Sequence, residues 1–291
     1  MRFVLALILV WVVDPSYAGS FDDCGTVAGA AQLWAKPTTR YVLIGEFHGM
    51  AETPAAFGDI VCAAAHAGKA VVVGLELPQR EQPFYDAYLA SDGTETDRAK
   101  LFGATMWTSG MKDGRTSLAM LALLDKLRKW KHAGANIALV AFQPNGMSSG
   151  IPSAPSEYEA RMANIILDAA GMNTGQLVVA LMGNWHASKS RELFPGASLP
   201  YDPMAMHLPA EAIVNILAVP LKSGSAWNCM PRGADKDARS VVCGPHPFAM
   251  QATLGNVTPS APGVTLFDKT YNGYDGILAL ERATASPPAV P

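Results

Sequence analysis

Charged residues are scarce in this sequence, and a basic surface suited to a polyanionic partner is missing. Only 16% of the residues are Asp, Glu, Lys or Arg, and the net charge is −3 at pH 7. The one dense basic run, residues 126–131, lies on one face of a predicted helix and follows Asp125. Alternating charge of this kind is typical of a solvated helix face. The sequence therefore predicts no nucleic-acid partner.

Beyond the N-terminus, no apolar run approaches the roughly 20 residues that span a bilayer. Residues 3–13 form a shorter apolar run, which follows Arg2 and leads into small residues suited to cleavage after Ala18. This pattern is typical of a secretion signal and is too short for a membrane anchor. We expect a signal peptide at 1–18 and a periplasmic or secreted mature chain at 19–291, with no membrane association after cleavage. No cysteine stands at the cut, so lipid anchoring is not supported.

The four cysteines lack the Cys-x-x-Cys spacing of common zinc sites. An even number in an exported chain indicates two disulfides, for which three pairings exist. We favour Cys24–Cys62 and Cys229–Cys243. The second bridge would close a loop rich in Gly, Pro and charge, and would stabilise the fold by about 3 kcal/mol in the chain-entropy model. The thirteen methionines are scattered, as core-filling residues are, and do not indicate a copper site.

Short aliphatic segments alternate with amphipathic ones along the chain. The predicted strands are 41–44, 70–75, 137–142, 177–182, 213–219 and 276–280, and the predicted helices are 55–67, 82–90, 116–131 and 156–170. The strands do not alternate in polarity, as is typical of buried parallel strands. The fold class is therefore α/β, with a mostly parallel central sheet and helices on both faces.

We expect one domain, with a small helical insertion at residues 83–115. Residues 227–247 look irregular and pinned by a disulfide, and 257–262 and 286–291 look like Pro-rich connectors or tail. The helix at 156–170 has the clearest start, because Ser156 and Glu159 form a capping box.

A Gly-x-x-His motif follows two of the predicted strands. It reads Gly45-Glu46-Phe47-His48 after the first strand and Gly183-Asn184-Trp185-His186 after the fourth, and the second strand runs into Glu76. Parallel strands end at one edge of the sheet, where ligands bind in open α/β folds. We therefore expect Glu46, His48, Glu76 and His186 to converge. One such residue alone is more often structural, but charge at three strand ends is costly without a function.

Two imidazoles and two carboxylates support two kinds of chemistry. His48, Glu76 and His186 could ligate a divalent metal and leave one position open for water. Without metal, a histidine would act as general base and a carboxylate would orient it. His186 would be the second ligand or an electrophilic partner, and Asn184 would position substrate or water.

A second group precedes the helix at 116–131, in a loop that could cover the cleft. Arg115 would bind an anionic substrate group or pair with Glu76. Trp107 would contact substrate. The alternative is a surface turn at Asp113-Gly114, with Trp107 in the core.

The two motifs, with Glu76 between them, resemble the pattern of the ChaN/TraB/Tiki superfamily. The segment GEFHGMAETP, which begins at Gly45, is similar to the opening motif of erythromycin-esterase-like proteins. Similarity runs from about Tyr41 to His186 and is looser in the C-terminal third. Tiki-like relatives imply a metal-dependent protease with His48, Glu76 and His186 as ligands. Esterase-like relatives imply that His48 is the base for water, with Glu46 beside it. ChaN implies haem binding in iron uptake, although this chain lacks the lipoprotein cysteine.

These observations predict an exported hydrolase-like protein that acts on an ester or peptide bond. Its partner would be a small-molecule or peptide substrate, and its cofactor, where it has one, a divalent metal. The alternatives are a non-catalytic haem or iron binder and an envelope protein with a relic site. The sequence does not predict the oligomeric state.

Overall fold

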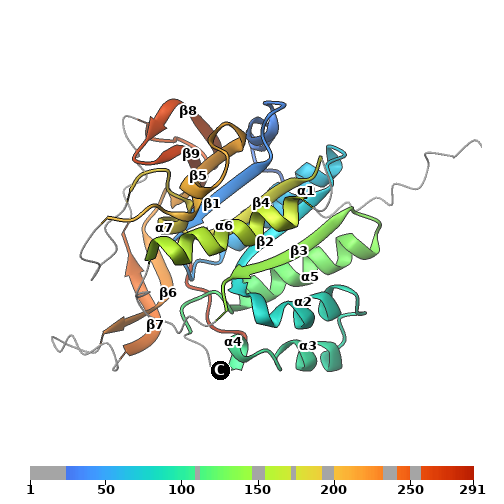
Figure 1. Ribbon diagram of the computed structural model, residues 1–291. Helices are drawn as coiled ribbons and strands as arrows, with labels where there is room; N and C mark the ends of the chain where they lie inside the picture. The colour runs from blue at the N-terminus through green and yellow to red at the C-terminus, as the bar shows by residue number, and fades with distance from the viewer. Residues whose placement is uncertain are drawn as a thin grey trace, which may run out of the picture.

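The computed structural model describes residues 24–108, 112–145, 155–171, 175–191, 200–231, 241–249 and 257–291 (Figure 1). The predicted secretion signal lies outside these residues. The central sheet of the protein has seven strands in the order β3-β2-β4-β1-β5-β9-β8. They are β1 (Tyr41–Glu46), β2 (Val71–Pro78), β3 (Ile137–Gln143), β4 (Leu177–Gly183), β5 (Ile213–Pro220), β8 (Gly263–Tyr271) and β9 (Tyr274–Leu280). Every pairing is parallel except that of β8 with β9, which confirms the mostly parallel α/β fold.

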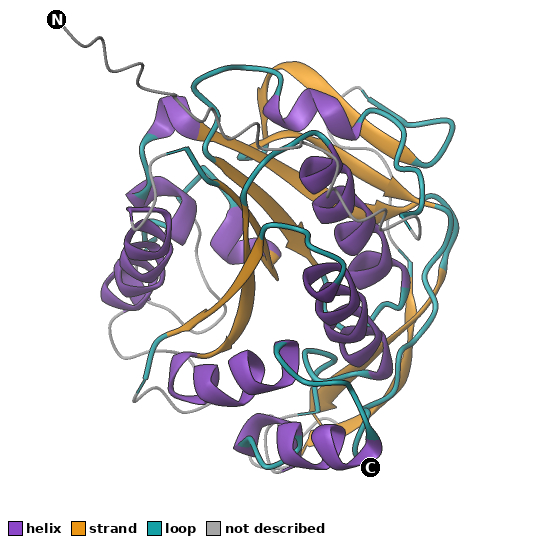
Figure 2. Ribbon diagram, turned by 90° about the vertical axis from the view of Figure 1, so that its right-hand side faces the viewer, coloured by secondary structure: helices purple, strands orange, loops and turns teal. Residues whose placement is uncertain are grey.

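Helices cover both faces of the sheet, as Figure 2 shows. On one face, Val42 and Ile44 of β1 share a core with α1 (Glu52–His66) and α5 (Leu118–His132). On the other face, Tyr41 and Leu43 share a core with α6 (Pro155–Gly171). Because both faces of β1 are covered, all six of its residues are buried. This explains why the strand sequences show no alternation.

The expected helical insertion contains α2 (Gln82–Leu89), α3 (Glu95–Leu101) and α4 (Thr105–Thr108). The remaining helical segments are α7 (Asn184–Ala187) and the 3-10 helices η1 (Ala30–Trp34), η2 (Gln79–Glu81), η3 (Met204–His207) and η4 (Ala210–Ala212). In the part of the chain that the structure describes, none of the helices has the length and apolarity needed to cross a bilayer.

Both predicted disulfides are present: Cys24–Cys62 and Cys229–Cys243. The expectation of an irregular segment at 227–247 was wrong for residues 227–231 and 241–247, while 232–240 lie outside the described residues. β6 (Gly224–Pro231) and β7 (Val241–Phe248) form a separate antiparallel pair, in which Cys229 stands directly opposite Cys243. The prolines and glycines of these segments argue against strands, so the sequence did not predict them. Pro245 pairs with Trp227, whose N–H points away to the carbonyl of Gly49, so the missing proline N–H costs no bond within the pair.

The C-terminal residues 284–290, which we name the C-terminal strap, are packed rather than a loose tail. Ser286 N donates to the Gly49 carbonyl at 2.9 Å, and Ala289 N donates to the Thr116 carbonyl at 3.0 Å. Lys112 Nζ donates to the Val290 carbonyl at 2.9 Å. The strap therefore joins the loop that follows β1 to the loop that precedes α5, and the C-terminus lies near α4 (Figure 1).

Candidate functional site

The four residues predicted to converge do so at one edge of the sheet. β1 and β2 both flank β4, so Glu46, Glu76 and Gly183 reach this edge together. His48 Nε2 lies 3.6 Å from Glu76 Oε2, and His186 Nε2 lies 3.8 Å from Glu76 Oε1. Glu76 is thus the centre of the cluster, with one imidazole on each of its oxygens.

Glu76 is held in place by two donors. Gly183 N donates to Oε2 at 2.7 Å, and Arg115 Nη1 donates to Oε1 at 2.8 Å. The predicted pairing of Arg115 with Glu76 is therefore confirmed. Burial alone would raise the pKa of Glu76, but His186, Arg115, His48 and the Gly183 amide outweigh it and hold the pKa below its usual value. Glu76 is an anion at neutral pH.

Arg115 is engaged by protein groups on most of its donors. Its Nε lies 3.1 Å and its Nη2 2.6 Å from Asp113 Oδ2, and Nη1 also lies 3.5 Å from Gln143 Oε1. Burial opposes its charge, yet Asp113 and Glu76 raise its pKa further above the usual range. The same ion pair lowers the pKa of Asp113. This geometry fits an arginine that fixes Glu76 better than one that waits for an anionic substrate.

His48 and Glu46 form a second buried pair. His48 Nδ1 lies 3.0 Å from Glu46 Oε1. Burial lowers the pKa of His48, but Glu46 and Glu76 together raise it above its ordinary value. Burial raises the pKa of Glu46 more than His48 lowers it. Among the described residues, Glu46 Oε2 is buried without a hydrogen-bond partner. The His48 side chain keeps 21% of its surface exposed, so Nε2 is within reach of a ligand.

The other ring nitrogen of His186, Nδ1, contacts a residue that lies outside both Gly-x-x-His motifs. Nδ1 lies 2.8 Å from both carboxylate oxygens of Glu159, on α6. Burial lowers the pKa of His186, but Glu159 and Glu76 outweigh it and raise the pKa to about 9. The ring also faces Tyr158, with 6.0 Å between centroids.

The sequence predicts that Glu159 forms a capping box with Ser156, and this interpretation requires no tertiary partner for Glu159. In the structure its carboxylate instead contacts His186 and the Met204 amide. A usable signal existed, since Glu159 neighbours the apolar stripe of α6, where a buried carboxylate needs a partner. Asp113 and Gln143 had no comparable signal.

Two further predicted residues have other surroundings. Trp107 lies in α4, is fully buried and packs against Phe102 with ring centroids 5.6 Å apart. Trp107 is therefore a core residue, the alternative that the sequence also allowed, and does not contact substrate as predicted. Asn184 opens α7 beside the cluster, and its carbonyl accepts a hydrogen bond from the Tyr274 hydroxyl.

The donor set does not fit a preformed metal centre. Both oxygens of Glu76 already accept hydrogen bonds, and the Arg115 cation lies 2.8 Å from one of them. A divalent cation there would compete with a fixed positive charge. Among the described residues, the group of ligand atoms spaced for a metal is Cys24, Cys62 and His66, and its cysteines form a disulfide.

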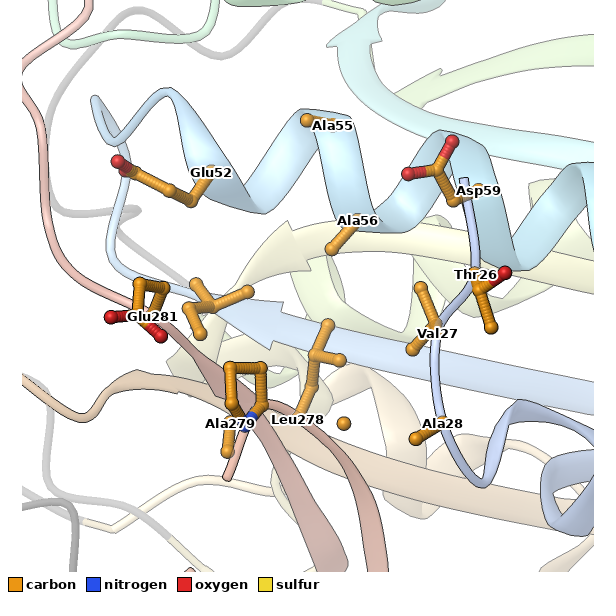
Figure 3. Close-up of a pocket in the computed structure, with 13 residues that line it drawn as sticks. Thr26, Val27, Ala28, Glu52, Ala55, Ala56, Asp59, Leu278, Ala279 and Glu281 are labelled. Carbon is orange, nitrogen blue, oxygen red and sulfur yellow. The ribbon is translucent and has the colours of Figure 1, made fainter. Parts of the chain in front are cut away.

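A cavity of about 250 Å³ lies apart from the cluster, between α1 and the end of β9 (Figure 3). Alanines of α1 and Leu278 line its wall, and three acids surround it. Each acid already has a partner: Glu52 accepts from Thr284 N, Asp59 from Gly25 N, and Glu281 from Lys222. We assign no function to this cavity.

The fold is similar to that of known hydrolase and biosynthetic proteins. An erythromycin esterase, EreC, solved as a single-residue mutant in its open conformation, has a TM-score of 0.63 and 13% identity, over 88% of this chain and 93% of that chain. A succinoglycan biosynthesis protein has a TM-score of 0.59 and 10% identity, over 88% of this chain and 91% of that chain. A Bacillus cereus protein has a TM-score of 0.56 and 11% identity, over 86% of this chain and 90% of that chain.

Identities this low show a shared fold alone. No family model matches the chain, and no curated protein matches it in sequence. The esterase part of the resemblance is therefore supported at the level of fold, while membership of the ChaN/TraB/Tiki superfamily stays a prediction.

Proposed function

We propose that this chain is an exported hydrolase that cleaves esters by histidine acid–base chemistry, without a bound metal. One observation carries the proposal: two imidazoles direct Nε2 toward the same buried carboxylate, and both rings are partly open to solvent, His48 more than His186. A purely structural cluster would gain nothing from leaving a histidine of this kind exposed. The two disulfides support export, since such bonds persist in oxidising compartments.

His48 has the geometry of the general base. Glu46 holds Nδ1, so the lone pair of the neutral ring lies on Nε2, toward Glu76 and the open side. Nε2 would take a proton from water while the water oxygen adds to the ester carbonyl carbon. The unpartnered, buried Oε2 of Glu46 supports a role for that carboxyl beside the reacting water.

His186 suits the complementary role. Its raised pKa of about 9 keeps it protonated at neutral pH, so it can stabilise the oxyanion that forms on the carbonyl oxygen. The carbon–oxygen bond to the alcohol then breaks, and the alcohol takes the proton held by His48. The products are one carboxylic acid and one alcohol, as the addition of one water requires.

The substrate class is proposed from the fold likeness. The structure named as an erythromycin esterase covers nearly the whole chain, which makes a lactone or other ester the first substrate to test. Peptides are the second class of substrate to test. Haem binding stays a prediction that no contact in the cluster specifically favours.

The test is a panel of p-nitrophenyl esters, erythromycin and short peptides, with hydrolysis followed by absorbance or by the added mass of water. We expect turnover by the parent protein after EDTA treatment. His48→Ala and Glu76→Ala should lower kcat/KM by about 10²–10⁴-fold, the range for loss of general acid–base catalysis. His132→Ala, at an exposed histidine ending α5, is the matched control.

If His48→Ala and Glu76→Ala match the parent on a substrate that it turns over, the proposal is wrong. Loss of all parent activity after EDTA treatment, with recovery on adding Zn²⁺, would overturn its metal-free part.

A further inference from the structure

Glu159 is a buried carboxylate that the proposed reaction does not use. It lies on α6 with 2% of its surface exposed. Its Oε1 and Oε2 each lie 2.8 Å from His186 Nδ1, and Oε2 also accepts from Met204 N at 2.8 Å. A carboxylate this deep is costly unless charge-assisted hydrogen bonds compensate it. Its position therefore calls for an explanation beyond helix formation.

The contacts show that Nδ1 of His186 carries a hydrogen. An ionised carboxylate accepts hydrogen bonds and cannot donate them, so a ring nitrogen 2.8 Å from both of its oxygens carries a hydrogen. With Nδ1 protonated, Nε2 is the nitrogen left to face Glu76 and the reacting groups. A neutral ring protonated only on Nε2 would place the lone pair of Nδ1 against the carboxylate.

The second contact of Glu159 adds a positional constraint. Met204 begins η3, which packs against α6, and its amide donates to Oε2. Tyr158, Glu76 and Arg115 are the other charged or titratable groups near His186, and none of them contacts Nδ1 in the described part of the chain. Glu159 is thus the group that determines the orientation of this ring.

We propose that Glu159 is a positioning residue for His186: it keeps the proton on Nδ1, presents Nε2 to the site, and ties the ring to η3. The catalytic benefit rests on the proposed function, but the orientation of the ring does not. A carboxylate behind a metal-bound histidine fixes its tautomer and ring orientation, and its loss typically costs about 10–100-fold in activity; we expect a cost of this order here.

The first test reads the imidazole directly. Long-range ¹H–¹⁵N NMR spectra of EDTA-treated protein labelled in its histidines distinguish a protonated from an unprotonated Nδ1, and His186→Asn assigns the signal. We expect a protonated Nδ1 on His186 in the parent at neutral pH. An unprotonated Nδ1 in the parent overturns the proposal without any variant of Glu159.

The second test uses Glu159→Gln, with Glu157→Gln as matched control. Glu157 lies on the exposed side of the same helix and pairs with Arg161. In Glu159→Gln the amide N–H₂ can donate to Nδ1, so we expect His186 to lose the proton on Nδ1 and keep only the one on Nε2, and kcat to fall about 10–100-fold with KM nearly unchanged. Glu157→Gln should leave both unchanged.

If Glu159→Gln does not fold, Glu159→Asp keeps the charge but withdraws it from the ring, and it should weaken the same NMR signature. Imidazole spectra and kcat equal to those of the parent in a folded variant would overturn the proposal. A parent protein without activity would count against the hydrolase, while the NMR result would still decide the role of Glu159.

Discussion

The two histidines of the site are held by different acids, and this difference has a measurable consequence. Glu46 bonds His48, the more exposed ring, while Glu159 bonds His186 from within the core. If His48 is the base, it must be neutral, and if His186 stabilises the oxyanion, it must be charged. The two rings must then carry one positive charge between them, and that charge must be on His186.

A bell-shaped pH profile of kcat/KM is the expected result. Activity should rise as pH passes the pKa of His48, which is raised above 6.5, and fall as pH passes about 9, where His186 loses its proton. In Glu46→Gln the rising limb should move to lower pH, because a carboxylate that favours the imidazolium has been removed. Initial rates from pH 5 to 10.5 provide the check. A rising limb that moves to higher pH in Glu46→Gln would contradict the assignment of His48.

Gly183 provides a second prediction at this scale. A Cβ added there would lie 3.3 Å from His48 Nε2 and 3.5 Å from Glu76 Oε2, where a substrate or water would approach. Gly183→Ala should therefore lower kcat/KM by roughly tenfold or more through misplacement of these groups, while the free energy of unfolding changes by about 1 kcal/mol.

Gly171→Ala is the matched control for this variant, since a Cβ at that position meets no atom within 4 Å. Enzyme assays and urea unfolding measure the two effects separately. Unchanged activity in folded Gly183→Ala would show that reacting groups do not use the space beside Gly183.

At the scale of elements, the sequence predicted the strands that are continuous aliphatic runs. β1 and β4 are continuous aliphatic runs, because helices cover each side of them. It failed on β6 and β7, since Pro231, Pro245 and Pro247 are compatible with a strand pair only when no ladder bond needs their nitrogen. It also failed on β8, an edge strand in which only Val264 is buried.

The two disulfides should differ in their effect on stability. Cys24–Cys62 spans 38 residues and attaches the N-terminal segment to α1, whose Cys62 is fully buried in the main core. Its double replacement by serine should lower the free energy of unfolding by about 4 kcal/mol. Cys229–Cys243 lies within the separate β6–β7 pair, so its double replacement should loosen that hairpin and change global unfolding by less.

Urea unfolding followed by tryptophan fluorescence, together with limited proteolysis of the hairpin, compares the two variants. An equal or larger loss of global stability on removal of Cys229–Cys243 would show that the hairpin is a cooperative part of the domain.

For the whole molecule, the site depends on strand order, which the sequence does not state. Glu46 and Glu76 come together because β4 inserts between β1 and β2, and the motif spacing alone would also allow other orders. The prediction of convergence succeeded because any parallel arrangement brings strand ends to one edge. It could not reveal Glu159 or the strap, since their partners are set by packing between distant segments.

The C-terminal strap ties the site loops to the rest of the molecule, and several backbone segments meet at Gly49. The Gly49 carbonyl accepts from both Trp227 N and Ser286 N at 2.9 Å. A Cβ on Gly114 would lie 2.3 Å from Gly49, so the loop that carries Arg115 presses on the loop that carries His48. Both loops are thus positioned by contacts outside the sheet.

Removal of residues 286–291 should therefore impair the site while the sheet stays folded. The truncation deletes five hydrogen bonds, each worth about 1 kcal/mol: two donated by Ser286 N and Ala289 N, and three accepted by Ser286 Oγ, Pro287 O and Val290 O. A loss of about 5 kcal/mol leaves a domain in the middle of the ordinary range of stability folded. We expect faster amide hydrogen exchange in residues 48–50 and 112–118 and a lower kcat. Removal of Pro291 alone is the control, and equal exchange in both truncated proteins would show that the strap does not hold the site loops.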